Sequence, residues 1–123
     1  MSICLYAVSS RRLKIIAKLL LVAGLTGVAS ADSVVSMCKN TDDVCKCASA
    51  RLKADAGDET YALYEAIGAA FLTNRSGGMG MGDAWDAAVK AESTKRAASF
   101  VETMQQTNAI GQAHRKAIKC CAG

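Results

Sequence analysis

Five of the six cysteines of this 123-residue chain gather in two groups, and their placement predicts disulfide chemistry. Three lie in the stretch from 37 to 47, and two adjacent ones lie three residues from the C-terminus. Cysteines at this density in a small domain are typical of proteins that fold in an oxidising compartment. We therefore expect one or two disulfides to join the N- and C-terminal regions. The candidates, with Cys4 left aside, are Cys38, Cys45, Cys47, Cys120 and Cys121.

The spacing of Cys45 and Cys47 favours two separate disulfides over one redox-active pair. On a helix, residues two apart point about 200° away from each other. One of them can face the C-terminal helix while the other faces the segment that contains Cys38. Spacing does not decide which cysteine pairs with which. The odd thiol could stay free, ligate a metal, or link two copies of the chain as a homodimer.

Soft metal ligands offer a second chemistry. Met79 and Met81 form a Met-x-Met pair in a glycine-rich loop, and thioethers favour copper(I). His114, the one histidine of the chain, could add an imidazole. Against a metal, the Cys-x-x-Cys spacing of structural zinc sites is missing, and methionines in a loop can equally anchor it on a core. We expect no cofactor, with copper as the alternative.

The sequence shows no convincing catalytic constellation. A general base at His114 would need a nucleophile and an orienting carboxylate, and spacing identifies neither. The glycine loop at 75–82 lacks the Gly-Lys-Ser/Thr ending of a phosphate-binding loop. We therefore expect a protein that is not an enzyme.

The elements that would hold these residues are helices. Proline is absent, alanine is abundant, and apolar residues recur at spacings of three and four. We predict an all-α domain of three to four helices, clipped by the disulfides, with an irregular segment at 32–40. The expected helices run from Thr41 or Asp42 to Gly57, from Asp58 to about Asn74, from Asp83 onward, and to Cys121.

Two of these helices carry apolar lines that predict which face is buried. Gly68 interrupts the first, where glycine costs about 1 kcal/mol relative to alanine, so we expect a neighbouring helix to approach closely there. The first line consists of Leu63, Tyr64, Ile67, Ala70 and Phe71. The last helix carries Ala97, Phe100, Met104, Thr107, Gly111, His114, Ile118 and Cys121.

Residues 1–31 have the pattern of a secretory signal peptide. A basic stretch around Arg11 and Arg12 precedes an apolar run at 19–28, and Ala29-Ser30-Ala31 supplies a cleavage motif. The run is about ten residues long, half of what a membrane-spanning helix needs. We predict one mature domain, residues 32–123, located in the periplasm or secreted, without a stable membrane anchor after cleavage.

Charge argues against a nucleic-acid partner. The whole chain has a formal net charge of +4, but the excess lies in residues 1–31, which contain basic residues and no acidic one. The predicted mature protein is therefore neutral, which removes the electrostatic attraction to phosphates.

In size, export signal and cysteine placement the chain is similar to small periplasmic helical proteins with a disulfide clip, such as acid-stress chaperones of the HdeA type. This likeness implies no functional residue. We predict a non-enzymatic envelope accessory module that binds another protein. Tyr61 and Trp85, on either side of the glycine loop, are the candidate contact residues, because aromatic side chains are favoured interface anchors. The rival prediction is a periplasmic copper-binding protein using the Met-x-Met loop.

Overall fold

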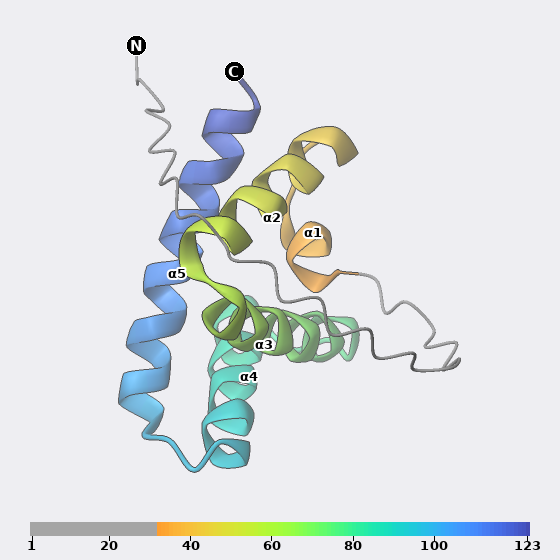
Figure 1. Ribbon diagram of the computed structural model, residues 1–123. Coiled ribbons are helices and arrows are strands. Elements are labelled where there is room, and N and C mark those ends of the chain that lie inside the picture. Colours follow the sequence, from red (N-terminus) through yellow and green to blue (C-terminus); the bar gives the residue numbers. More distant parts are fainter. Residues whose placement is uncertain (1–31) are drawn as a thin grey trace, which may run out of the picture. The chain divides into compact units, whose positions relative to one another are not determined.

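Five helices make up residues 32–123, the part of the chain that the computed structural model describes (Figure 1). These residues contain no strand, which confirms the all-α class. The predicted signal peptide, residues 1–31, lies outside the described residues. The helices are α1 (Ser33–Met37), α2 (Asp42–Ala56), α3 (Asp58–Ser76), α4 (Met81–Lys95) and α5 (Phe100–Cys121).

The boundaries of α2 follow from capping residues that can be recognised in the sequence. The Thr41 hydroxyl accepts a hydrogen bond from the Val44 amide, and two aspartates stand in the first turn, where the helix dipole favours negative charge. Gly57 ends the helix with φ of 84°, a left-handed conformation that glycine adopts without strain. Asp58 is the first residue of α3, which begins directly after this corner.

Helix α1 is the element that the sequence did not predict, and it raises the helix count above three to four. The Asp32 carboxylate caps it by accepting from the Val34 amide at 2.9 Å. At five residues α1 is too short to show a helical period. It packs where a close approach was expected: a Cβ at Gly68 would overlap the Met37 thioether and lie 3.2 Å from the Ser33 hydroxyl.

The longer helices pack in two pairs, α2 with α5 and α3 with α4. Figure 1 shows α5 along one side, with α2 beside one end and α4 beside the other, while α3 crosses between them. Two groups of buried side chains fill the interior, and Trp85 packs against both. The first group is Val34, Leu52, Tyr61, Tyr64 and Ile110, and the second is Leu63, Ile67, Ala88 and Val89.

The buried face of α5 overlaps the predicted line. Thr107 and His114 are buried, whereas Phe100 is 41% exposed. The face also includes Thr103, Ile110 and Ala117, which the line left out. The two threonines can be buried because their hydroxyls donate to carbonyl oxygens one turn earlier in the chain.

Two disulfides join parts of the described chain. Cys38–Cys45 connects the end of α1 to α2, and Cys47–Cys121 connects α2 to the end of α5 across a sequence separation of 74. Closing a loop of that length stabilises the fold by about 4 kcal/mol in the chain-entropy model. Cys120 is also disulfide-bonded, so residues 32–123 hold no free thiol. Within the same residues, no helix combines the length and apolar character that crossing a membrane requires.

Candidate functional site

The two predicted contact aromatics belong to the interior. Tyr61 is 5% exposed and packs in the first core group. Trp85 is half-buried, with its ring edge-on to Phe71 at 5.4 Å and to Tyr64 at 6.3 Å between centroids. Both side chains therefore help to hold helices together, Tyr61 from a buried position and Trp85 from a partly exposed one.

A polar network surrounds the Tyr61 hydroxyl. One carboxylate oxygen of Asp32 lies 2.8 Å from the Tyr61 hydroxyl and 3.0 Å from the Ser49 hydroxyl, both of which can donate to it. The two hydroxyl oxygens are also in contact, so their two protons are shared among three polar contacts. Burial raises the pKa of Tyr61 to about 12. Because Ser49 and Tyr61 are at most 6% exposed, a substrate has no access to them. The network joins the start of α1 to α2 and α3, which is a structural role.

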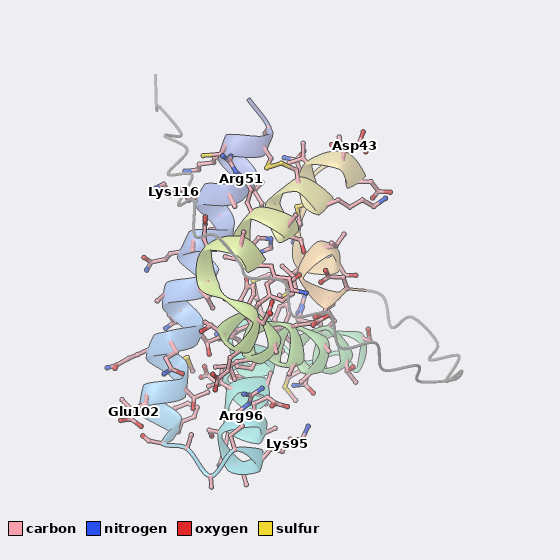
Figure 2. All side chains as sticks on the ribbon, in the orientation of Figure 1. Asp43, Arg51, Lys95, Arg96, Glu102 and Lys116 are labelled. Atoms are coloured by element: carbon pink, nitrogen blue, oxygen red, sulfur yellow. A yellow bond between two sulfur atoms is a disulfide. The ribbon has the colours of Figure 1, made fainter. Side chains whose placement is uncertain are left out.

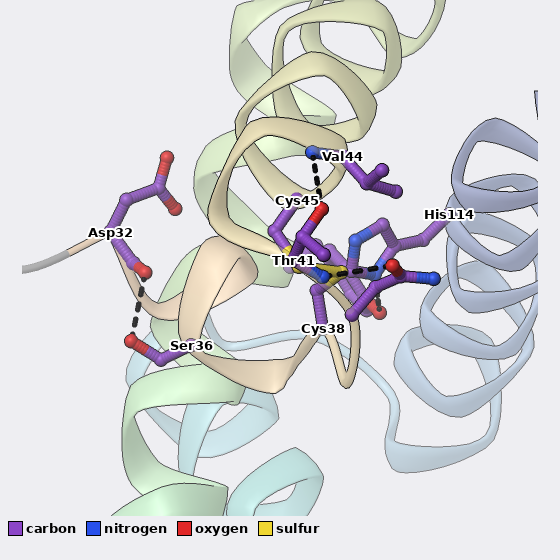
Figure 3. Close-up of a disulfide and its surroundings, with 9 residues drawn as sticks. Asp32, Ser36, Cys38, Thr41, Val44, Cys45 and His114 are labelled. Carbon is purple, nitrogen blue, oxygen red and sulfur yellow. Dashed lines mark hydrogen bonds between the residues drawn. A yellow bond between two sulfur atoms is a disulfide. The ribbon is translucent and has the colours of Figure 1, made fainter. Parts of the chain in front are cut away.

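His114 forms a second buried polar contact. It is 3% exposed, and its Nδ1 lies 3.1 Å from the Tyr64 hydroxyl, while Nε2 is buried without a hydrogen-bond partner. Figure 3 shows the ring among the residues around the Cys38–Cys45 disulfide. Burial lowers the pKa of His114 below its ordinary value of 6.5, although the charge of Asp32 opposes this. Burial therefore favours the neutral form of the imidazole.

The methionine pair stands apart from this buried histidine. Met79 and Met81 are 39% and 58% exposed, at the junction of α3 and α4. The Arg75 guanidinium donates to the Met79 carbonyl at 2.8 Å, which fastens the loop to the end of α3. His114, on α5, instead contacts the Tyr64 hydroxyl on α3. Residues 32–123 contain no cluster of three or more His, Cys, Asp or Glu side chains able to hold a metal ion.

A groove of about 720 Å³ opens among the described residues. We call it the α2–α3–α5 groove. Leu52, Leu63 and Ile110 form an apolar floor, each at most 7% exposed. Its other lining residues are mostly small or polar: Asp55, Ala56, Glu59, Thr60, Arg96, Ala98, Thr103, Gln106, Ala109 and Ala113. A pocket with an apolar floor and a few polar groups is the usual form of a binding site.

The charges on this groove are unequal. Asp55 and Glu59 are exposed on either side of the α2–α3 corner, and neither forms an ion pair within residues 32–123. Arg96 also lines the groove, but its guanidinium lies 3.5 Å from the Glu92 carboxylate. Figure 2 shows Arg96 beside Lys95 where α4 ends. The wall at the corner therefore carries uncompensated negative charge.

Sequence reasoning missed this groove because it arises where three helices meet. Ala109 and Ala113 are one turn apart on α5, so the sequence does show that one face of this helix carries small side chains. Their alignment with the corner at Gly57 depends on how α5 packs on α2.

No family model, curated protein or solved structure matches the chain. The function proposed below therefore depends on the geometry and the charge of the α2–α3–α5 groove.

Proposed function

We propose that this protein is an exported, non-enzymatic binding module that holds a segment of another protein in the α2–α3–α5 groove. The observation that carries the proposal is the groove itself, about 720 Å³ with an apolar floor beneath a polar rim. Protein interfaces have the same anatomy, with an apolar centre surrounded by polar groups. The two disulfides support export, because such bonds persist in oxidising compartments.

The polar clusters away from the groove support a non-enzymatic role. The Asp32–Ser49–Tyr61 network and the His114–Tyr64 contact join polar side chains between helices. Ser49, Tyr61, Tyr64 and His114 are buried, and catalytic groups must reach a substrate. These polar contacts hold the packed helices together.

The small side chains along α5 suit the binding of a helix or an extended segment. Ala109 and Ala113 are exposed, and they leave room where longer side chains would close the groove over Ile110. A partner can therefore place bulky side chains on the floor. Recognition of an amphipathic segment in an apolar groove is a common mode of peptide binding.

A substitution that fills the groove tests the proposal. Ala109→Trp places an indole in the groove from an exposed position, and Ala91→Trp on the exposed face of α4 is the matched control. Proteins crosslinked to residues 32–123 in an envelope extract are quantified by mass spectrometry. We expect a partner that the control retains and Ala109→Trp loses, with both variants unfolding as the wild type does. A partner bound equally by both variants would place the binding surface elsewhere.

The second candidate function, copper binding, is favoured by the exposure of both thioethers on one loop. Titration of copper(I) against the protein and against Met79→Leu/Met81→Leu tests it. Binding that the double substitution abolishes would support a copper site. An unchanged titration curve would end this alternative.

A further inference from the structure

We propose that the α2–α3–α5 groove selects a basic amphipathic segment, in which lysine or arginine residues flank bulky apolar side chains. This inference rests on the proposed function and names the chemistry of the ligand. It follows from the unpaired carboxylates of Asp55 and Glu59 and from the small-residue lining of α5.

The α2–α3 corner sets the charge of the groove. Asp55 is two residues before Gly57 and Glu59 is two residues after it, and the positive φ of Gly57 turns the chain so that both side chains line the same groove. Neither carboxylate has an ion-pair partner in residues 32–123. Two unpaired carboxylates beside an apolar surface produce a negative potential that attracts cations and repels anionic segments.

Arg96 does not neutralise the negative charge of Asp55 and Glu59. Its guanidinium pairs with Glu92, which is 5% exposed, and that pairing holds the arginine at the end of α4. The groove thus has a negative wall at the corner and a positive group elsewhere in its lining. A ligand cation is favoured beside Asp55 and Glu59, and unfavourable beside Arg96, so the charge pattern also orients the segment.

The apolar lining determines the rest of the ligand. Leu52, Leu63 and Ile110 form an apolar floor that excludes water when a ligand covers it. Ala56, Ala109 and Ala113 have small side chains, so they leave the groove open above this floor. Bulky aliphatic or aromatic side chains fill such a space and bury the most apolar area. Thr60 and Gln106 can hydrogen-bond to the exposed backbone of the segment.

Three peptides of identical leucine spacing test the inference, with lysine, glutamine or glutamate at the flanking positions. Their affinities for residues 32–123 are measured by fluorescence anisotropy at low and high salt. We expect the lysine peptide to bind most tightly and the glutamate peptide least, and the difference to shrink at high salt. Asp55→Asn/Glu59→Gln is expected to weaken the lysine peptide about fivefold to tenfold, since each exposed ion pair contributes modestly.

A charge-matched control keeps the result interpretable. Asp86→Asn/Glu102→Gln removes two carboxylates that do not line the groove, and it should leave the affinity within about twofold of the wild type. Urea denaturation of both double variants establishes that each one is folded. Equal losses in the two double variants would show that only net charge matters, and this would overturn the inference.

Other outcomes separate this inference from the proposed function. If all three peptides bind equally and Ala109→Trp abolishes their binding, the groove is a binding site without charge selection, and only the inference fails. If no peptide binds while Ala109→Trp still removes an envelope partner, the inference fails and the proposed function stands. A homodimer that dissociates in Asp55→Asn/Glu59→Gln would identify a second copy as the occupant and overturn the inference.

Discussion

Individual polar residues determine how the first three helices meet. The Asp32 carboxylate accepts hydrogen bonds from the Val34 amide and from the Ser49 and Tyr61 hydroxyls. Each donor belongs to a different helix, so one side chain links α1, α2 and α3. The two hydroxyl donors are buried, so the loss of their acceptor would leave them unsatisfied, and an unsatisfied buried polar group is costly.

Tyr61→Phe tests this network. The substitution removes one donor to Asp32 and leaves the ring in place, so we expect the free energy of unfolding to fall by about 1–2 kcal/mol. Ser36→Ala is the control, because its exposed hydroxyl bond to the Asp32 carbonyl should contribute less than about 0.5 kcal/mol. Urea denaturation at neutral pH measures both. Equal effects of the two substitutions would contradict a stabilising network.

His114 gives the protein a predictable dependence on pH. Its pKa is lowered in the folded state, so between its folded pKa and about 6.5 the unfolded chain binds more protons than the native one. The free energy of unfolding should therefore be fully maintained above pH 6.5 and decrease as the pH falls below it.

His114→Gln should flatten this decrease between pH 7 and pH 5, because no other histidine exists in the chain. Urea denaturation at several pH values measures the slope for both proteins. The wild-type value at pH 7 is the reference for each series. A slope that the substitution leaves unchanged would show that other groups cause it.

At the scale of elements, α2 connects most of the structure. It packs on α5, contacts α1 and α3, and carries one cysteine of each described disulfide. Cys45 turns toward α1 and Cys47 toward α5, as expected for helical residues two apart. The two bonds differ in the loops they close, with sequence separations of 7 and 74.

This difference predicts unequal effects of removing each disulfide. Cys47→Ala/Cys121→Ala should lower the free energy of unfolding by about 4 kcal/mol, and Cys38→Ala/Cys45→Ala by about 2.5 kcal/mol, because the entropy of the unfolded chain rises more with the longer loop. Urea denaturation without reductant measures both double variants. A larger loss from the short-loop variant would show that local strain or packing outweighs loop entropy.

At the scale of the whole molecule, both core groups and both described disulfides lie within residues 32–123. Asp32, the first residue after the predicted cleavage motif, is also the first residue of the buried network. A chain that begins there keeps the α1 cap, both core groups and these two disulfides.

We expect the exported protein to begin at Asp32 and to contain Cys38–Cys45 and Cys47–Cys121. Intact mass and peptide mapping without reduction measure the N-terminus and the pairing. The same chain produced from residue 32 should unfold in one cooperative transition. A retained leader, or a different pairing in native protein, would contradict this prediction.

The sequence by itself determined the helical class, the boundaries of α2 and the close approach at Gly68. These features depend on local rules: periodicity, a threonine cap, and glycine at a left-handed corner. It did not reveal α1, which is shorter than a recognisable period. It placed Thr107 and His114 on the buried face of α5, as the structure has them, but left out Thr103, whose hydroxyl is satisfied by its own helix, and Ile110.

Only the tertiary structure decided which residues line the groove. Tyr61 and Trp85 have the composition of interface anchors, yet the packing of α1, α3 and α4 buries them wholly or in part. The groove instead combines Asp55, Glu59 and Ala109, which belong to three different helices. Local rules specify each helix separately, whereas a groove depends on the distances and angles between helices. Those are set by side-chain packing across the whole chain.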